Sequence, residues 1–399
     1  MEATGTDTRK NEMKYEKSEL ELMSTYQLRE ICRREKIMNG VIHPLDKEEL
    51  IQTIMRYMGK RQDFLICDRK KGGEERVEEF LKNTRIVIKP SEELYCQSQI
   101  LAYEGLSIEY YDDYTIPYKK ELAGTNAFLM GSDKTLCAIL NLKEHGGKQE
   151  KLYLTKAAEL ETRETQRKDY RIFCMGRQNS ECMYHLYYGE QTILPEHIEV
   201  YSIPLIDFVV RKPVTLMLPM AIDFGSVNTT AGVYLDSAYF EHVGQQAAIK
   251  NCRENEINYT VFEDGAGESM LLPSVIGVLA VEEEDYKLLF GYDAIRLANA
   301  SYVDEGFCVF YDVKRWIGEY DKEEEIVDRQ GRRRLVKRAE ILRRFFLYII
   351  RKTENRFKCR ISQVHISSPV KQKHYFRRMF REILPEYMIN QEIMLDEGM

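Results

Sequence analysis

The sequence predicts an α+β protein of several domains: an N-terminal helix–extended–helix module, a mostly β middle domain and a C-terminal α/β domain. Three observations support this prediction. Apolar residues recur at helical spacing between residues 24 and 58, short segments rich in Ile, Tyr and Val fill residues 85–213, and strand-like and helix-like segments alternate after residue 214. A chain of 399 residues is long enough for roughly two to four domains.

Composition and charge exclude several classes of protein. The formal net charge is −7, so the chain is no polycation, and any nucleic-acid contact would need a local basic patch. The nine cysteines include no Cys-x-x-Cys pair, which suits a reducing compartment and predicts a cytoplasmic protein. No apolar run is long enough to span a bilayer, so we expect no membrane partner.

The N-terminal part predicts a short lead-in and two helices. Residues 1–20 are polar and charged, which predicts a disordered segment. Residues 21–82 form the predicted helical module. Asp46 and Glu49 have the spacing of a capping box and open its second helix. An extended turn at 41–44 separates this helix from the first.

This helix–extended–helix pattern resembles the SAP-type module, a family that acts mostly in DNA binding. The resemblance covers roughly 35 residues, and its signature is short. Basic residues outnumber acidic ones here, and five of them are candidates for nonspecific contacts with DNA phosphates: Arg33, Arg34, Lys36, Lys60 and Arg61. A solvated helical hairpin used for protein contacts is the alternative.

The middle segment, residues 83–213, reads as strands separated by Gly, Pro, Asn and Asp. One of these predicted strands covers residues 182–189. Cys174, Cys182 and His185 raise the question of a metal site, but no fourth ligand has suitable spacing. Single cysteines in strands are more often buried apolar side chains. This segment predicts no function.

The C-terminal segment, residues 214–399, opens with a candidate phosphate-binding turn in "MAIDFGSVNTTAGVYL". Asp223 ends an apolar strand, and a carboxylate there would act on phosphate through Mg²⁺ or its waters. The missing side chain of Gly225 allows close approach of the backbone, so that successive amides can bind an anion. The candidate cofactor-binding residues are Asp223, Gly225, Ser226, Val227, Asn228 and Thr229. An ordinary hairpin turn is the alternative.

Several further segments follow in an order that resembles the actin-like ATPase superfamily, and best its DnaK-type heat-shock chaperones. These segments are "LLPSVIGV" (271–278), "FGYDAIRLAN" (290–299), "CVFYDVKRWIG" (308–318), "VHISSPV" (364–370) and "IMLDEGM" (393–399). The resemblance covers about residues 217–399. It implies the first, RNase H-like lobe of such an ATPase, which is a five-stranded mixed sheet flanked by helices.

The resemblance also implies the cofactors, ATP or ADP with Mg²⁺, and residue roles. Asp223 would order the waters of the magnesium ion, and Gly225 with the residues after it would cradle the β- and γ-phosphates. Lys314 matches the lysine that reaches the γ-phosphate and the attacking water, where a cation offsets developing charge. Glu397 matches the carboxylate near the metal and the nucleophilic water.

The sequence departs from the family pattern at several positions. Val227 stands where the family often has a threonine, and Gly398 where a proline usually follows the glutamate. Basic residues at 332–338 read as an insertion-like solvated loop. The family's second phosphate loop, adenosine motif and peptide-binding domain are not recognisable.

We therefore expect a fragment or split half of a DnaK-like ATPase that couples nucleotide binding to binding of a client or co-chaperone. ATP hydrolysis is expected only if a second lobe is supplied. The alternative is a non-enzymatic DNA- or protein-binding adaptor with a degenerate ATPase-like scaffold. A sugar or acetate kinase of the same superfamily fits "VFYDVKRWIG" less well.

Overall fold

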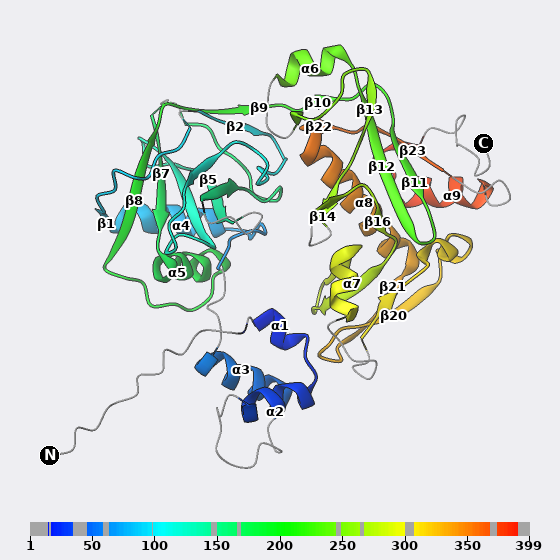
Figure 1. Ribbon diagram of the computed structural model, residues 1–399, viewed down its shortest axis with the longest axis horizontal. Helices are drawn as coiled ribbons and strands as arrows, with labels where there is room; N and C mark the ends of the chain where they lie inside the picture. The colour runs from blue at the N-terminus through cyan, green and yellow to red at the C-terminus, as the bar shows by residue number, and fades with distance from the viewer. Residues whose placement is uncertain are drawn as a thin grey trace.

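The computed structural model shows a mixed α/β protein (Figure 1). It describes residues 15, 17–34, 46–58, 64–97, 99–144, 150–165, 169–244, 249–263, 267–299, 307–367 and 373–389. Four residues with a predicted role lie outside these ranges: Lys36, Lys60, Arg61 and Glu397. No helix in the described ranges is long and apolar enough to cross a membrane.

The N-terminal helices are α1 (Lys17–Glu21), α2 (Thr25–Arg34) and α3 (Lys47–Met58). They share a small core made of Leu20, Leu28, Ile31, Cys32, Leu50, Ile51 and Ile54. The predicted capping box is confirmed, because the Glu49 N–H donates to Asp46 Oδ1 at 2.8 Å and the Asp46 N–H donates to Glu49 Oε2 at 3.0 Å. The predicted extended turn at 41–44 lies outside the described residues.

The middle region (residues 64–211) is built on a seven-stranded sheet of order β1-β8-β7-β4-β5-β6-β3. Only β1 and β8 pair in parallel on this path; the other neighbours are antiparallel. The strands are β1 (Arg85–Ile88), β3 (Thr115–Pro117), β4 (Thr125–Gly131), β5 (Leu136–Lys143), β6 (Lys151–Thr155), β7 (Tyr170–Met175) and β8 (His197–Leu205).

Two helices, α4 (Gly73–Asn83) and α5 (Arg177–Tyr188), cover one face of this sheet. Along β4 the side chains alternate, so that Phe128 packs with these helices while Ala127 and Leu129 face a second core on the other side. The sequence predicted a boundary after residue 82. The packing instead joins α4 to the sheet that follows it, since Val77 and Leu81 of α4 are buried in the same core as Phe128.

The strand predicted at 182–189 is wrong, because these residues form most of α5. Met183 and Tyr187 are buried four residues apart, which places both on the helix face that packs on the sheet. Gly189 ends the helix with a φ of 75°, and its N–H donates to the carbonyls of the last turn. The aromatic composition favoured a strand, but burial selected the helical period.

The C-terminal region (residues 214–389) contains a mixed sheet of order β13-β12-β11-β23-β24, with β16 pairing on β12. Its strands are β11 (Met220–Phe224), β12 (Asn228–Leu235), β13 (Glu256–Tyr259), β16 (Leu272–Pro273), β23 (Gln363–Ile366) and β24 (Met388–Ile389). β11, β12 and β13 are antiparallel neighbours, whereas β11, β23 and β24 run parallel.

Helices α8 (Arg338–Phe357) and α9 (Lys373–Ile383) pack against this sheet (Figure 1). The apolar repeat predicted for the long helix is confirmed, with Phe345, Phe346 and their helix-face neighbours fully buried. Phe346 joins the layers: its ring centroid lies 5.0 Å from that of Phe224 on β11 and 4.7 Å from that of Phe380 on α9.

A smaller group of elements borders the sheet. It comprises β17 (Ile276–Val281), β18 (Tyr286–Phe290), α7 (Tyr292–Asn299), β19 (Val309–Phe310), the 3₁₀ helix η3 (Val313–Glu319), β20 (Glu323–Val327) and β21 (Arg333–Lys337). The loop predicted at 332–338 is wrong: most of it is strand β21, paired with β20. Buried Asp328 explains the turn, since its carboxylate accepts the N–H groups of Gln330 and Arg332 and that of Val281 on the neighbouring strand.

One short parallel strand pair lies on each side of the boundary between the middle and C-terminal regions. β2 (Gln99–Tyr103) pairs with β9 (Asp207–Arg211), and β10 (Val214–Thr215) pairs with β22 (Cys359–Arg360). The chain passes from β9 to β10 through only two residues. The remaining elements, α6 (Ser237–Val243), β14 (Phe262–Glu263) and β15 (Glu268–Ser269), lie in the C-terminal region.

Candidate functional site

Asp223 and Ser367 lie at the carboxyl ends of two neighbouring parallel strands. β11 carries Asp223 and ends at Phe224, while β23 ends at Ile366, directly before Ser367. The Ser367 hydroxyl donates to Asp223 Oδ1 at 2.5 Å, and the same hydroxyl oxygen accepts the Phe224 N–H at 3.2 Å. Because ligands of open α/β sheets collect at the carboxyl ends of strands, this pair marks the candidate site.

The turn from β11 to β12 leaves no room for a side chain at Gly225. A Cβ there would lie 2.3 Å from the Asn228 carbonyl oxygen, which also accepts the Gly225 N–H at 3.0 Å. Ser274, which directly follows β16, forms two hydrogen bonds to the turn. Its hydroxyl donates to the Gly225 carbonyl at 2.8 Å, and its N–H donates to the Val227 carbonyl at 2.8 Å. The hairpin is therefore a fixed structure that requires glycine at this position.

The other predicted phosphate-binding residues differ in what they offer. Thr229 is fully buried, and its hydroxyl lies 2.8 Å from that of Ser274, so this hydroxyl is used inside the hairpin. Ser226 and Val227 form the exposed tip. In the part of the chain that the structure describes, their backbone amides donate to no protein acceptor. Adjacent unpaired amides can bind an anion, but the tip offers fewer donors than the sequence predicted.

Lys314 belongs to η3, which two fully buried residues, Val313 and Ile317, anchor in the core of the C-terminal region. Its side chain is half-buried. A short series of contacts connects η3 to the β11–β12 hairpin. Ser274, which donates to the hairpin turn, lies two residues before Ile276 of β17, and Ile276 pairs with Phe310 of β19. The helix η3 begins three residues after Phe310.

The oxygen atoms of the side chains near the hairpin are suitable ligands for a hydrated magnesium ion. Asp223, Ser226 and Ser367 offer carboxylate and hydroxyl oxygens, the ligand type that Mg²⁺ prefers, and Asp223 is exposed as contact through water would require. Among the described residues no group of three or more His, Cys, Asp or Glu side chains could hold a metal directly.

The two described arginines of the predicted DNA-binding set contact protein groups. Arg33 forms an exposed ion pair with Glu30 at 2.7 Å, one helical turn before it. Arg34 donates to the Tyr15 hydroxyl at 2.6 Å. An exposed ion pair such as that of Arg33 with Glu30 is weak.

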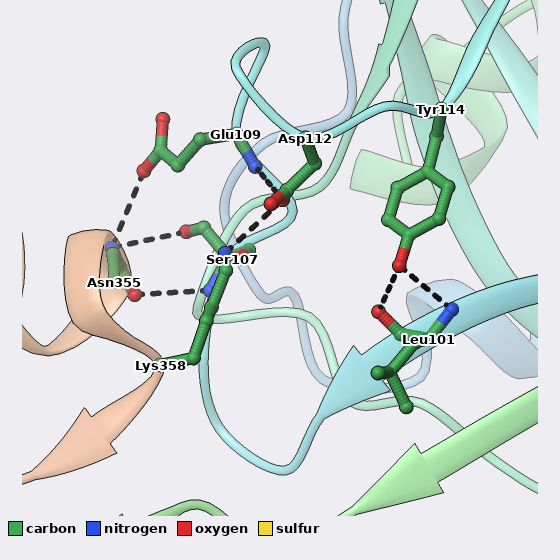
Figure 2. A network of polar contacts seen from close by, with 7 residues as sticks. All are labelled: Leu101, Ser107, Glu109, Asp112, Tyr114, Asn355 and Lys358. Carbon is green, nitrogen blue, oxygen red and sulfur yellow. Dashed lines mark hydrogen bonds and ion pairs between the residues drawn. The ribbon is translucent and has the colours of Figure 1, made fainter. Parts of the chain in front are cut away.

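A second polar cluster, which the sequence did not predict, joins the middle and C-terminal regions (Figure 2). The Lys358 ammonium donates to Asp112 Oδ2 at 3.1 Å and to the Ser107 carbonyl at 2.9 Å. Asn355 accepts the Ser107 N–H at 3.0 Å and donates to Glu109 Oε1 at 3.4 Å. Figure 2 shows that these contacts join the end of α8 to the loop before β3.

Two charged groups of this cluster are buried, so each depends on the other for compensation of its charge. The side chains of Lys358 and Asp112 are 3% and 4% exposed. Burial raises the pKa of the Asp112 carboxyl, and the nearby charge of Lys358 opposes that rise. Lys358 ends α8 in the left-handed conformation with φ 50°. No pattern in the sequence predicts this cluster, since neither Lys358 nor Asp112 belongs to a motif.

No protein-family model matches the chain, and the search of the curated proteins found no match.

Proposed function

We propose that the C-terminal region is a nucleotide-binding lobe of the actin-like ATPase type, closest to the DnaK-type chaperones. Its main sheet supports this proposal. An antiparallel hairpin, β11 and β12, lies beside the parallel strands β23 and β24, and α8 and α9 pack against them. The mixed strand directions and the flanking helices agree with what the resemblance implies, although the sheet has six strands where the resemblance implies five.

The proposed phosphate site is the tip of the β11–β12 hairpin. The unpaired amides of Ser226 and Val227 would bind phosphate oxygens, and Asp223 would hold the waters of a magnesium ion. Bound Mg²⁺ would neutralise charge on the β- and γ-phosphates. Ser367 orients the Asp223 carboxylate by its hydrogen bond, which keeps this acceptor directed at the strand ends.

Lys314 is the proposed cation for the γ-phosphate. Phosphoryl transfer needs positioned positive charge more than a protein nucleophile, so a lysine on a firmly anchored 3₁₀ helix suits the role. Glu397, the second proposed catalytic residue, lies outside the described residues. We propose that hydrolysis needs a second lobe and that this chain alone binds nucleotide weakly, because one lobe supplies only part of the phosphate contacts.

The observation on which the proposal depends most is the juxtaposition of Asp223, Ser367 and a sterically required Gly225 at one end of two parallel strands. A second candidate function is an adaptor in which the lobe is a scaffold and the N-terminal helices bind DNA or protein. That candidate is favoured by the internal use of the Gly225 amide and the Thr229 hydroxyl, which removes two donors from the phosphate site.

Calorimetric titration of the full chain with Mg-ATP tests the proposal. We expect weak binding that Asp223→Ala and Lys314→Ala each reduce at least about tenfold, the effect of losing roughly 1.4 kcal/mol. Asp321→Ala and Lys322→Ala are matched controls, because these residues are exposed and lie on the same region. Melting temperatures of all four variants show whether the fold is retained.

Two results would decide against the nucleotide site. One is heat of Mg-ATP binding that is the same in Asp223→Ala and in the unsubstituted chain. The other is an absence of binding in a complex that contains a second lobe. In that case binding of a DNA duplex, weakened by salt as phosphate contacts require, would support the adaptor.

A further inference from the structure

A pocket of about 360 Å³ lies where the middle region meets the C-terminal region. This volume is at the lower end of the range of small-molecule sites, about 300–1,000 Å³. Its lining comes from both regions: Cys67, Ser107, Ile108, Glu109, Tyr110, Asn141, Lys143, Glu144, Thr155, Lys156 and Ala157 from the middle region, and Glu263 and Lys352 from the C-terminal region. A molecule in this pocket would therefore touch both.

Lys156 lines the pocket as a buried cation with too few acceptors. It is 3% exposed, and among the residues that the structure describes its ammonium donates only to the neighbouring Ala157 carbonyl, at 3.3 Å. Within the described ranges no carboxylate forms an ion pair with it. Burying an unpaired charge is costly, and native proteins normally pair or coordinate such a group. An ammonium has three N–H donors, and two of those of Lys156 have no acceptor among the described residues.

Asn141 supplies a second, independent observation. It is 2% exposed, and its side-chain oxygen is buried without a hydrogen-bond partner among the described residues. The amide nitrogen of the same side chain donates to Cys67 Sγ at 3.3 Å. Asn141 lies opposite Thr155 in the β5–β6 ladder, one residue before Lys156. The pocket is therefore lined by a hydrogen-bond acceptor that lacks a partner among the described residues, Asn141 Oδ1, and by a cation that has only one acceptor among them, the Lys156 ammonium.

We propose that this pocket binds a small anion, a carboxylate or a phosphate ester, that also carries an O–H or N–H donor. Its anionic group would pair with Lys156, and its donor would satisfy Asn141 Oδ1. The other charges suit a ligand of mixed character, since Lys143 and Lys352 attract the anion while Glu109 and Glu263 accept hydrogen bonds from hydroxyl or amine groups. The site is separate from the β11–β12 hairpin.

Binding here would strengthen the junction between the two regions. Ser107 and Glu109 line the pocket and also contact Asn355 of α8 in the cluster of Figure 2. Glu263 and Lys352 approach from the C-terminal region. A ligand that binds only when these groups are together stabilises the folded chain by RT ln(1 + c/Kd), where c is the free ligand concentration, so the stabilisation grows with ligand concentration.

Three probes that share a three-carbon backbone test the ligand class on the full chain: glycerol 3-phosphate, glycerate and neutral glycerol. We expect one or both anions to raise the melting temperature in a concentration-dependent way and glycerol to have no effect at the same concentration. Whichever anion binds more tightly by calorimetry identifies the source of the charge. No effect of either anion at about 10 mM, tenfold above a weak millimolar Kd, overturns the proposal.

Lys156→Met tests the cation, and Lys151→Met is its control, because Lys151 is exposed at the start of β6, the strand that ends directly before Lys156. We expect Lys156→Met to lose anion binding at least tenfold while the unliganded protein melts at the same or a higher temperature, since an unpaired buried charge is removed. Asn141→Leu should also weaken binding, and more for the hydroxylated anions than for sulfate, which has no O–H or N–H donor. Lys151→Met should bind as the unsubstituted chain does.

The melting temperature separates a ligand site from a structural lysine. If Lys156→Met lowers the melting temperature of the unliganded protein by several degrees, the ammonium stabilises the fold and the proposal is overturned. Anion binding that is equal in Lys156→Met and Lys151→Met overturns it as well. Neither result bears on Mg-ATP binding at the hairpin, which involves other residues.

Discussion

The Lys358 ammonium lies 3.1 Å from the Asp112 carboxylate, although 246 positions separate the two residues in the chain. Both side chains are more than nine-tenths buried, so the pair is enclosed between the middle and C-terminal regions. Removing one partner leaves the other charge without compensation inside the protein. The junction between the regions therefore depends on both residues at once.

The first prediction concerns this pair. Lys358→Met and Asp112→Asn should each destabilise the protein, the former by about 3–5 kcal/mol, because Asp112 stays buried and charged. The double variant should lose much less than the sum of the two single losses. Urea denaturation of the four proteins measures the coupling. Additive losses would mean that the ion pair does not hold the junction.

The second prediction concerns Gly225. Gly225→Ala should destabilise the protein by about 1–3 kcal/mol, because the new Cβ would lie 2.3 Å from the Asn228 carbonyl oxygen and the hairpin must shift. Gly318→Ala is the matched control, since a Cβ there meets nothing within 4 Å. Thermal denaturation compares the two variants. Equal melting temperatures would contradict the tight turn.

The third prediction concerns the buried hydroxyls of Ser274 and Thr229. Ser274→Ala removes the donor to the Gly225 carbonyl and the partner of the Thr229 hydroxyl, and should cost about 1–3 kcal/mol. Adding Thr229→Val should cost little more, because it removes the hydroxyl left without a partner. A double-mutant cycle in urea checks this, and a full additional loss from the second substitution would argue against a shared hydrogen bond.

The fourth prediction concerns pH. Burial lowers the pKa of Lys156 to about 8, against weaker attraction from Glu74, Glu159 and Glu161. Between this value and the ordinary lysine pKa the unfolded chain binds more protons, so rising pH stabilises the folded state. The stability of the unsubstituted protein relative to Lys156→Met should therefore increase by about 2 kcal/mol from pH 7.5 to pH 9.5.

Urea denaturation of both proteins at the two pH values measures that difference. Groups common to both proteins, including the buried tyrosines that titrate at high pH, cancel in the comparison. A difference that stays constant would show that the Lys156 amine does not change its protonation on unfolding in this range.

Much of the local structure could be predicted from the sequence. The capping box at Asp46 and Glu49 and the apolar repeat around Phe345 depend on residues three or four positions apart, which a helix brings together wherever it lies. The prediction of a strand at 182–189 was wrong because aromatic residues suit both a strand and a buried helix face. Only the sheet beneath α5 selected the helix.

The sequence by itself determined the capping box at Asp46 and Glu49 and the apolar face of the long helix α8, and it identified Asp223 and Gly225 as the start of a candidate site. The tertiary structure decided which distant groups share hydrogen bonds: Ser367 with Asp223, Ser274 with Gly225, and Lys358 with Asp112. These partners come from strands and helices far apart in the chain. Their meeting follows from sheet order and core packing, which spacing along the sequence does not encode.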